Sequence, residues 1–201
     1  MSVLPLMVHG AALEALVVGG GRVAARKTAT LLDAGARVRL VAPEIDPSLR
    51  ALALTETTLR LEARPWAEDD IGDAQLVVAA TSDPSVNARV VAAARARARL
   101  VNAADDASAG TFTLPAVHRA GEMVIAVYAG GVPTAAVRIR DAVAKRFDAR
   151  YAAALATLSA MRRQLLERGE REGWRRVVEE RVSERFCDEV DAGRFAEEGA
   201  T

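Results

Sequence analysis

The sequence is short of the residues that build metal sites and disulfides. It has one cysteine, Cys187, and two histidines, His9 and His118, among 201 residues. A single cysteine excludes a disulfide within the chain and any cysteine-rich zinc or iron–sulfur site. We expect Cys187 to be a small buried hydrophobic residue on a helix and His118 to lie at the surface or at a helix end. No metal site is predicted.

A net charge and a long apolar run are also missing. The 27 basic and 27 acidic residues leave a net charge of zero, so no whole-molecule field attracts nucleic acid or an anionic membrane. No stretch reaches the roughly 18 uncharged apolar residues of a membrane-spanning helix. The first ten residues lack the basic segment and long apolar segment of a signal peptide. These absences predict no nucleic-acid partner, no membrane association and a cytoplasmic location.

What is present is an apolar fraction of 51% beside 27% charged residues. Such a composition is typical of a folded, alanine-rich helical or α/β protein. A chain of 201 residues can bury one good core with a smaller appended unit, or two modest domains.

In residues 15–35, ALVVGGGRVAARKTATLLDAG, the spacing of the apolar residues changes at three glycines. The apolar run that ends at Val18 predicts a short buried strand, and the apolar spacing from Arg22 predicts a helix that Gly35 ends. The next segment, RVRLVAP, predicts a second strand closed by Pro43. The glycines therefore lie at the strand-to-helix turn of a βαβ unit.

In this context Gly19-x-Gly21-x-x-Ala24 matches the dinucleotide-binding fingerprint. The first glycine allows the tight turn, the second lets the backbone approach a pyrophosphate, and the small third residue lets the helix pack on the strand. The anion then lies on the free N–H groups of the helix N-terminus. The acidic residue expected about 20 positions further on is not in place. Ala42 ends the second strand and the nearest acid, Glu44, follows it, so the sequence does not choose between NAD and NADP.

Two later segments predict strands whose carboxyl ends carry polar side chains. AQLVVAATSD predicts a buried strand over 76–80, and RLVNAADD predicts another that ends at Asn102. A helix over 84–98 is predicted between them, with Ser82 or Asp83 as its cap. In an open parallel sheet, ligands bind beyond the carboxyl ends of the strands, so we expect these polar residues to face the cofactor.

Five segments carry a family resemblance. They are LPLMV, VVGGGRVAARKTATLLDAGARVRLVAP, VVAATSDPSVN, VNAADDASAGTFTLPA and VIAVYAGGVPTAAVRIR. In this order they resemble the precorrin-2 dehydrogenase family, the NAD-dependent module of siroheme synthesis. The glycine-rich segment with the later Asn-x-x-Asp and Phe-x-x-Pro is far more specific than a glycine motif alone. The resemblance is strong over residues 3–147 and looser over the rest.

The resemblance implies an α/β fold: a Rossmann-type parallel sheet, a small dimerisation segment and a helical C-terminal domain. The expected ranges are 1–113, 114–147 and 148–201. It also implies a homodimer, NAD as cofactor, and oxidation of precorrin-2 to sirohydrochlorin in siroheme biosynthesis. The methyltransferase part of multifunctional relatives has no room in this chain. Two alternatives stay open: an enzyme that also inserts ferrous iron into sirohydrochlorin, and a non-catalytic NAD-sensing module.

The predicted catalytic residue is Asp105, on which the family's aspartate falls when counted from Asn102. A carboxylate beside the cofactor is a plausible base. The predicted cofactor-binding residues lie at the turns that follow the strands: Gly19, Gly20, Gly21, Arg22, Val23, Ala42, Pro43, Thr81, Asp83 and Asn87. A tetrapyrrole with many carboxylates calls for local cations, and residues 138–168 carry eight basic side chains against three acids. The predicted substrate-binding residues are Asn102, Gly130, Gly131, Arg138 and Arg140.

Apolar spacing predicts three helices in the last third of the chain. The first begins near Pro133, and its apolar face must pack on something, for which a two-fold partner is the expected answer. The faces comprise Ala136, Ile139, Val143 and Phe147; then Leu155, Leu158 and Leu165; then Trp174, Val178, Val182 and Phe186. Beyond Asp191 we expect a polar, frayed tail.

Overall fold

The structure is a computed structural model that describes residues 3–195. Its contacts divide the chain into two compact units, Met1–Leu114 and Pro115–Thr201. The predicted boundaries at 113/114 and 147/148 remain predictions.

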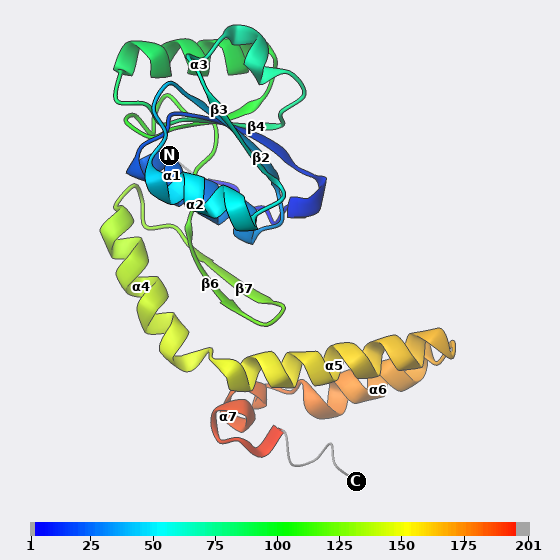
Figure 1. The fold of residues 1–201 in the computed structure, drawn as a ribbon. Helices are drawn as coiled ribbons and strands as arrows, with labels where there is room; N and C mark the ends of the chain where they lie inside the picture. Colours follow the sequence, from blue (N-terminus) through cyan, green and yellow to red (C-terminus); the bar gives the residue numbers. More distant parts are fainter. Residues whose placement is uncertain (1–2, 196–201) are drawn as a thin grey trace. The chain divides into compact units, whose positions relative to one another are not determined.

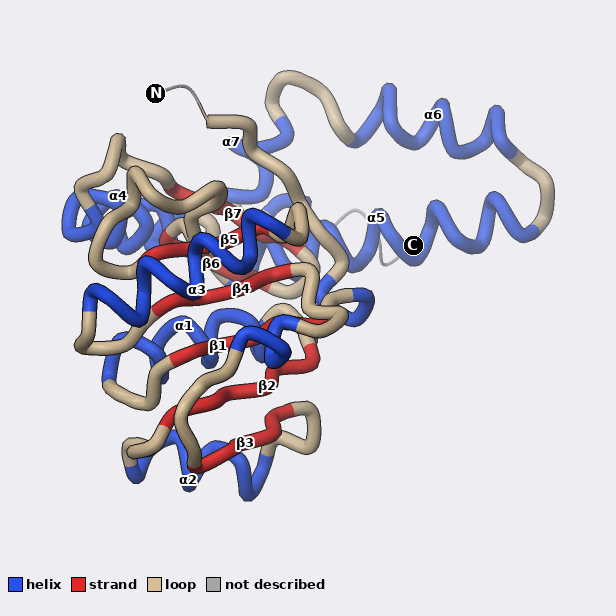
Figure 2. The backbone as a smooth tube through the Cα atoms, turned by 90° about the horizontal axis from the view of Figure 1, so that it is seen from above, coloured by secondary structure: helices blue, strands red, loops and turns tan. Residues whose placement is uncertain are grey.

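The first unit is built on five parallel strands in the order β3-β2-β1-β4-β5 (Figures 1 and 2). They are β1 (Glu14–Val18), β2 (Arg37–Ala42), β3 (Leu59–Ala63), β4 (Leu76–Ala79) and β5 (Leu100–Ala103). Central β1 pairs with β2 on one side and β4 on the other, so that Val18 lies opposite both Val41 and Ala79. The chain order therefore reverses at β1, which makes the carboxyl end of β1 the switch point where such sheets bind ligands. The predicted Rossmann-type sheet is confirmed.

Helices cover both faces of this sheet (Figures 1 and 2). α1 (Arg22–Asp33) and α2 (Pro47–Thr55) lie on one face, and α3 (Pro84–Ala96) lies on the other. Val17 belongs to the core beneath α1 and α2, and its neighbour Leu16 belongs to the core beneath α3. Because both faces are covered, the central strands are continuous apolar runs instead of alternating ones.

Two of the three helices begin with the same tripeptide, Asp-Pro-Ser. The carboxylate of Asp46 accepts from the backbone N of Ser48 at 2.9 Å, and that of Asp83 accepts from the backbone N of Ser85 at 2.8 Å. Proline in the first helical turn loses no hydrogen bond, because its missing N–H would be unpaired there. The predicted cap at the start of α3 is thus confirmed as Asp83.

The connection from β3 to β4 contains only a short 3-10 helix, η2 (Glu68–Ile71), where a full helix would cover the sheet. Asp70 in this turn is buried and accepts from the guanidinium groups of Arg64 and Arg39, the latter at 3.1 Å. The Arg64 hydrogen bond holds the pKa of Asp70 well below its ordinary value. The cluster fixes η2 beside the sheet, and the guanidinium of Arg39 is already paired with a carboxylate of the protein.

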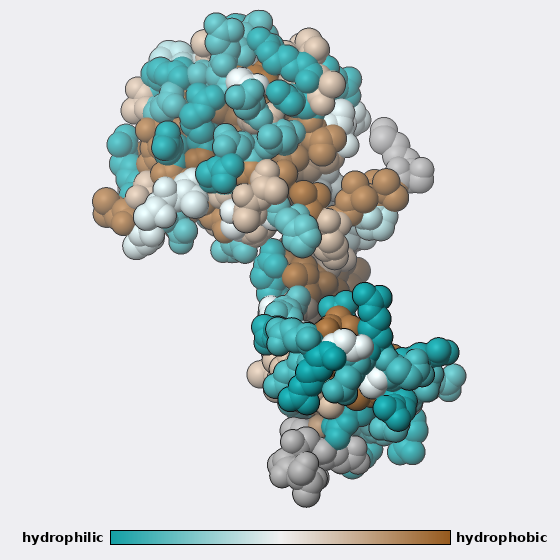
Figure 3. Space-filling model, turned by 90° about the vertical axis from the view of Figure 1, so that its right-hand side faces the viewer, coloured by the Kyte–Doolittle hydropathy of each residue, from teal (hydrophilic) through white to brown (hydrophobic). Residues whose placement is uncertain are grey.

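The second unit begins with an antiparallel hairpin, which the sequence analysis did not predict. Its strands are β6 (Ala116–Ala120) and β7 (Met123–Val127), followed by α4 (Pro133–Arg146), α5 (Ala149–Glu167), α6 (Arg171–Arg181) and α7 (Phe186–Asp191). Figure 3 shows mostly hydrophilic side chains on the visible face of these helices. Their small core comprises Tyr151, Ala154, Leu158, Val190 and Phe195.

The third helix predicted for this region is wrong in one respect. Trp174 and Val178 lie on α6, but Val182 is its C-cap and Phe186 opens α7. The helix breaks because the backbone N of Phe186 turns back to the carbonyl of Ser183 at 3.0 Å. The periodic spacing continued across this turn and concealed it.

The expected fraying beyond Asp191 is wrong for Phe195, which is buried and packs edge-to-face on Phe186 with ring centroids 5.3 Å apart. The rest of that predicted tail, residues 196–201, lies outside the described residues. His118 lies on β6, and its ring Nε2 is 2.5 Å from the carbonyl oxygen of Phe147, which ends α4. Cys187 lies on α7 and is half-buried.

Candidate dinucleotide-binding site

A cleft of about 860 Å³ lies at the carboxyl ends of β1, β2 and β4. Its walls come from the turns that follow these strands and from the segment after β3. The predicted cofactor residues that line it are Gly19, Gly20, Gly21, Ala42, Pro43, Thr81 and Asp83. Arg22 and Val23 are exposed in the first turn of α1. The cleft thus lies at the switch point of the sheet, where the fold places ligands.

A glycine stands at each of these three positions for a different structural reason. Gly19 has a φ of 123°, and a Cβ there would overlap the carbonyl of Ala80. A Cβ on Gly20 would overlap the carbonyl of Glu44, because the turn after β2 packs directly on it. A Cβ on Gly21 would meet nothing within 4 Å. The first two glycines are therefore required by the fold, whereas Gly21 leaves open space at the site.

The N-terminus of α1 is prepared for an anion. Gly21 is its N-cap, and within residues 3–195 no side chain caps this helix end. The first N–H groups of a helix have no partner inside the helix, and together with the helix dipole they attract phosphate. The other two helices that start at this edge, α2 and α3, carry Asp46 and Asp83 on the equivalent groups. A pyrophosphate is therefore favoured at α1 alone among the three.

Sequence reasoning missed several cleft residues, among them an aromatic and a cationic side chain. Trp66 and Arg89 line the cleft, with the Arg89 guanidinium 5.5 Å from the centre of the Trp66 ring. The Trp66 Nε1 is buried and has no hydrogen-bond partner in the described part of the chain. Pro65 and Val86 add apolar surface beside them. The only sequence signal was the RPW segment, whose place was hidden because β3 before it was not predicted.

Behind the cleft, Asn87 joins the turn after β4 to the segment after β5. Its Oδ1 accepts from the backbone N of Thr81 at 3.0 Å, and its Nδ2 donates to Oδ2 of Asp105 at 2.9 Å. Asn87 is 2% exposed, whereas Asp105 is exposed. The predicted catalytic carboxylate is thereby tied to Thr81, a residue of the cleft wall.

Asp105 is distinct from the two neighbouring acids at this edge. The side-chain and backbone hydrogen bonds from Ser85 lower the pKa of Asp83. Those from Ser108 lower the pKa of Asp106 in the same way. Both carboxylates therefore serve their own local turns, which leaves Asp105 as the exposed acid of the three available to a ligand.

The predicted substrate residues fall in two places. Asn102 is buried at the end of β5, where its Nδ2 donates to the carbonyl of Phe112 at 3.0 Å. Its Oδ1 is buried and has no partner among residues 3–195. The other four belong to the second unit: Gly130, Gly131, Arg138 and Arg140.

Within the second unit, Gly130 and Gly131 form the turn before α4 with φ values of 57° and 87°, which favour glycine. Arg140 pairs with Asp141 at 2.6 Å. Arg138 is exposed and has no ion pair or hydrogen bond in the described chain. Of the two predicted arginines, Arg138 therefore has the freer guanidinium.

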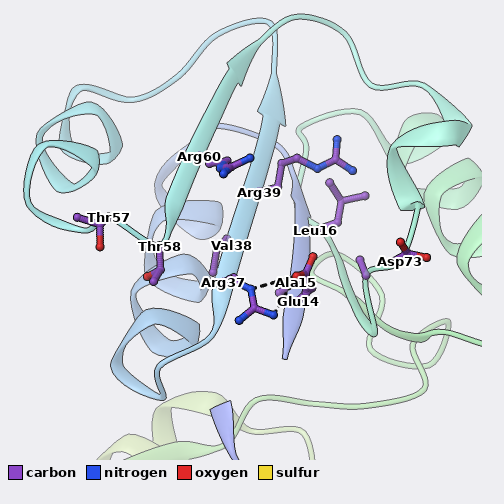
Figure 4. Close-up of a pocket in the computed structure, with 11 residues that line it drawn as sticks. Glu14, Ala15, Leu16, Arg37, Val38, Arg39, Thr57, Thr58, Arg60 and Asp73 are labelled. Atoms are coloured by element: carbon purple, nitrogen blue, oxygen red, sulfur yellow. Dashed lines mark hydrogen bonds and ion pairs between the residues drawn. The ribbon is translucent and has the colours of Figure 1, made fainter. Parts of the chain in front are cut away.

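A smaller pocket of about 380 Å³ lies at the amino-terminal ends of the strands (Figure 4). Arg37 on its wall pairs with Glu14 at 3.0 Å, and Arg39 is held by Asp70. This pocket lies at the edge of the sheet opposite the glycine turn, and two of its arginines are already neutralised. It does not compete with the cleft as a dinucleotide site.

Residues 3–195 contain no group of three or more His, Cys, Asp or Glu side chains that could hold a metal ion. None of the helices described is long and apolar enough to span a membrane.

The fold and the cleft define a Rossmann-type dinucleotide-binding protein. A family profile described as putative NAD(P)-binding matches residues 6–116. A siroheme synthase of Pseudomonas entomophila (strain L48) is 44% identical over 131 residues, which are 65% of this chain and 28% of the relative. Siroheme synthase 1 of Klebsiella pneumoniae subsp. pneumoniae is 33% identical over 197 residues, which are 98% of this chain and 40% of the relative.

Among solved structures, SirC, a precorrin-2 dehydrogenase, superposes with a TM-score of 0.75 over 98% of both chains at 24% identity, a likeness that shows the fold. The chain belongs to the putative NAD(P)-binding family, whose profile matches more than half of it, and it is similar to siroheme synthases. It spans less than half the length of these two synthases.

Proposed function

We propose that the chain is an NAD-dependent dehydrogenase that oxidises precorrin-2 to sirohydrochlorin in siroheme biosynthesis. The observation that carries the proposal is the hydrogen bond from Asn87 to Asp105, which ties an exposed carboxylate to the wall of a dinucleotide cleft. A site that only binds a dinucleotide has no need of an ordered acid at this position. The names of the related siroheme synthases and of SirC supply the substrate class.

The cleft fits a dinucleotide. Gly21 and the uncapped first turn of α1 would take the pyrophosphate. Trp66 and Val86 offer apolar surface to the flat adenine base. Glu44 follows β2, where an acidic side chain favours a free ribose hydroxyl and disfavours a 2′-phosphate. Of these features, Glu44 is the one that distinguishes the two cofactors, and it supports NAD over NADP.

When bound, the nicotinamide supplies the acceptor for the hydride that leaves the tetrapyrrole. Asp105 takes the proton that leaves with it, because it is an exposed carboxylate held in one orientation. Arg138 offers a guanidinium to the acetate and propionate groups of the substrate. The reaction then requires from the protein a held substrate and a placed base, and no resident metal.

The proposal includes a homodimer formed through the second unit. On α4, Val137 and Ile139 are 40% and 48% exposed, and Val132 before this helix is 56% exposed. Exposed aliphatic side chains are typical of an element that another subunit covers, here on more than one side of α4 because Val137 and Ile139 are two positions apart on the helix. Light scattering or sedimentation of the purified chain tests this part of the proposal, and a monomer at micromolar concentration would contradict it.

The test of function is anaerobic incubation of the purified chain with precorrin-2 and NAD⁺, followed by absorbance of NADH and of sirohydrochlorin. We expect both to appear together. No NADH, with NAD⁺ binding intact by calorimetry, would contradict the proposal and favour a non-catalytic NAD sensor. Addition of Co²⁺ to the product then tests the chelatase alternative, which requires a protein-dependent spectral change that Asp105→Ala abolishes.

A further inference from the structure

The side chain of Asn87 makes its hydrogen bonds inside the protein. Its Oδ1 accepts from the backbone N of Thr81 at 3.0 Å. The Thr81 hydroxyl lies 2.9 Å from this Oδ1 and 3.0 Å from the carbonyl of Asp83, and its single proton goes to one of the two at a time. The Asn87 Nδ2 donates to the carbonyl of Thr81 at 3.2 Å and to the carboxylate of Asp105 at 2.9 Å, which uses both of its donors.

These partners fix the amide in one orientation. If the amide were reversed, its nitrogen would face the Thr81 backbone N–H, and its oxygen would face the carboxylate of Asp105. Both contacts would be repulsive, so Nδ2 must point to Asp105. Asn87 is 2% exposed and does not line the cleft, so its contacts to Thr81 and Asp105 replace the predicted cofactor contact in the inference below.

Within residues 3–195 the carboxylate of Asp105 has one other hydrogen bond, in which its Oδ1 accepts from the backbone N of Asp106 at 3.1 Å. The two neighbouring acids, Asp83 and Asp106, are turned into hydrogen bonds with Ser85 and Ser108, and the cleft beside them also carries the charged Glu44, Asp46 and Arg89. The bond from Asn87 on α3 is therefore the contact that relates Asp105 to the rest of the site.

We propose that Asn87 is a positioning residue, which holds the Asp105 carboxylate in register with Thr81 on the wall of the cofactor cleft. The inference rests on the proposed function, in which Asp105 is the base. A base in fixed geometry avoids the cost of ordering it for every turnover, and a displacement of about 1 Å can lower a rate roughly a hundredfold. Asn87 would thus affect turnover without touching cofactor or substrate.

The sharpest test is Asn87→Asp, which keeps the shape and replaces the donor with a second carboxylate. Two carboxylates at hydrogen-bond distance repel each other, so such a pair takes up a shared proton more readily than a carboxylate beside an amide donor. We expect kcat to fall at least about tenfold at neutral pH and the acidic limb of its pH profile to move to higher pH. The Kd for NAD⁺, measured by calorimetry, should change by less than about threefold.

A matched control is Ser85→Ala, in the same first turn of α3, because in the described chain the Ser85 hydroxyl hydrogen-bonds to Asp83 and not to Asp105. This variant should leave kcat and its pH profile unchanged. A merely structural role for Asn87 predicts instead that Asn87→Asp lowers the melting temperature and leaves the acidic limb in place. That result would overturn the inference.

If Asn87→Asp alone does not fold, the exchange of Asn87→Asp with Asp105→Asn restores a donor opposite an acceptor. We expect this double variant to recover part of the melting temperature and none of the turnover. No recovery would show that the two side chains do not meet in solution and would overturn the inference. A wild-type chain that makes no NADH overturns this inference and the proposed function together, whereas an active wild type with an unmoved Asn87→Asp profile overturns this inference alone.

Discussion

The two units of the chain are stabilised to different degrees. In the first unit the central strands are fully buried, and Leu16, Val17 and Val77 are each 0% exposed. In the second unit α6 contains no buried residue, and the β7 side chains are at best half-buried. The first unit thus has a complete core around its ligand edge, whereas the second has apolar surface left to cover. This contrast supports the proposal that chemistry takes place in the first unit and association through the second.

The largest expected effect is a loss of turnover in the first unit without a loss of NAD⁺ binding. Asp105→Asn removes the proposed base, so kcat should fall by roughly 10²- to 10⁴-fold. The Kd for NAD⁺ should stay nearly the same, because the glycine turn is untouched. The control is Asp106→Asn, which keeps an acceptor for Ser108 and should retain activity. Equal losses in both variants would contradict the assignment of Asp105.

Two substitutions in the glycine turn distinguish a residue that the fold needs from one that cofactor binding needs. Gly20→Ala would push into the carbonyl of Glu44 and should destabilise the first unit by about 1–3 kcal/mol or more. Gly21→Ala has open space and should keep the melting temperature, but weaken NAD⁺ binding at least about tenfold. Thermal unfolding and calorimetry on the two variants check this. A stable Gly20→Ala or a tightly binding Gly21→Ala would break the distinction.

A smaller effect is expected at the uncovered side of the first unit. Asp70→Asn removes the carboxylate shared by Arg39 and Arg64 and should cost about 2 kcal/mol at neutral pH. Because the folded-state pKa of Asp70 is lowered, its contribution is present above the ordinary value of 3.8 and is lost as pH falls below it. Urea unfolding should therefore show a difference between wild type and variant that shrinks as the buffer becomes acidic. A difference independent of pH would contradict this.

The smallest effect lies in the second unit. Tyr151→Phe removes hydrogen bonds to Asp191 at 3.0 Å and to the carbonyl of Cys187 at 3.2 Å, and should cost about 1 kcal/mol. Burial raises the pKa of Tyr151 to about 12 from 10.0, so this contribution is full below pH 10.0 and is lost as pH rises through about 12. Unfolding at neutral and alkaline pH measures it, and NAD⁺ affinity should not change. An altered affinity would contradict the separation of the units.

The parts that could be predicted from the sequence are those where one signal dominates. The strand that ends at Val18 and the helix from Arg22 were predictable because a buried apolar run met a helical period at three glycines. The edge strand β3 was missed because Arg60 and Glu62 on its uncovered side interrupt the apolar run. The hairpin was missed because its short, half-buried strands carry little periodic signal.

The sequence predicted which strand ends form the site, but it did not predict how the side chains there contact one another. Thr81, Asp105 and Asp106 were predicted near the site because polar residues after buried strands meet at one edge, and the family resemblance chose Asp105 as the catalytic residue. Trp66 was missed because it follows an unpredicted strand. That the amide of Asn87 faces Thr81 and Asp105 depends on the packing of α3, which no local pattern reports. Whether each predicted site residue touches a ligand remains a prediction.

The repeated Asp-Pro-Ser start of α2 and α3 has a consequence for how a ligand is seated. Three helix ends point to the same edge, and each would attract a diphosphate if left bare. Two of these helix N-termini are capped by the protein's own carboxylates, so of the three only the N-terminus of α1 offers free N–H groups to a dinucleotide. The position at which a dinucleotide binds thus depends as much on the two capped helix ends as on the glycines at the uncapped one.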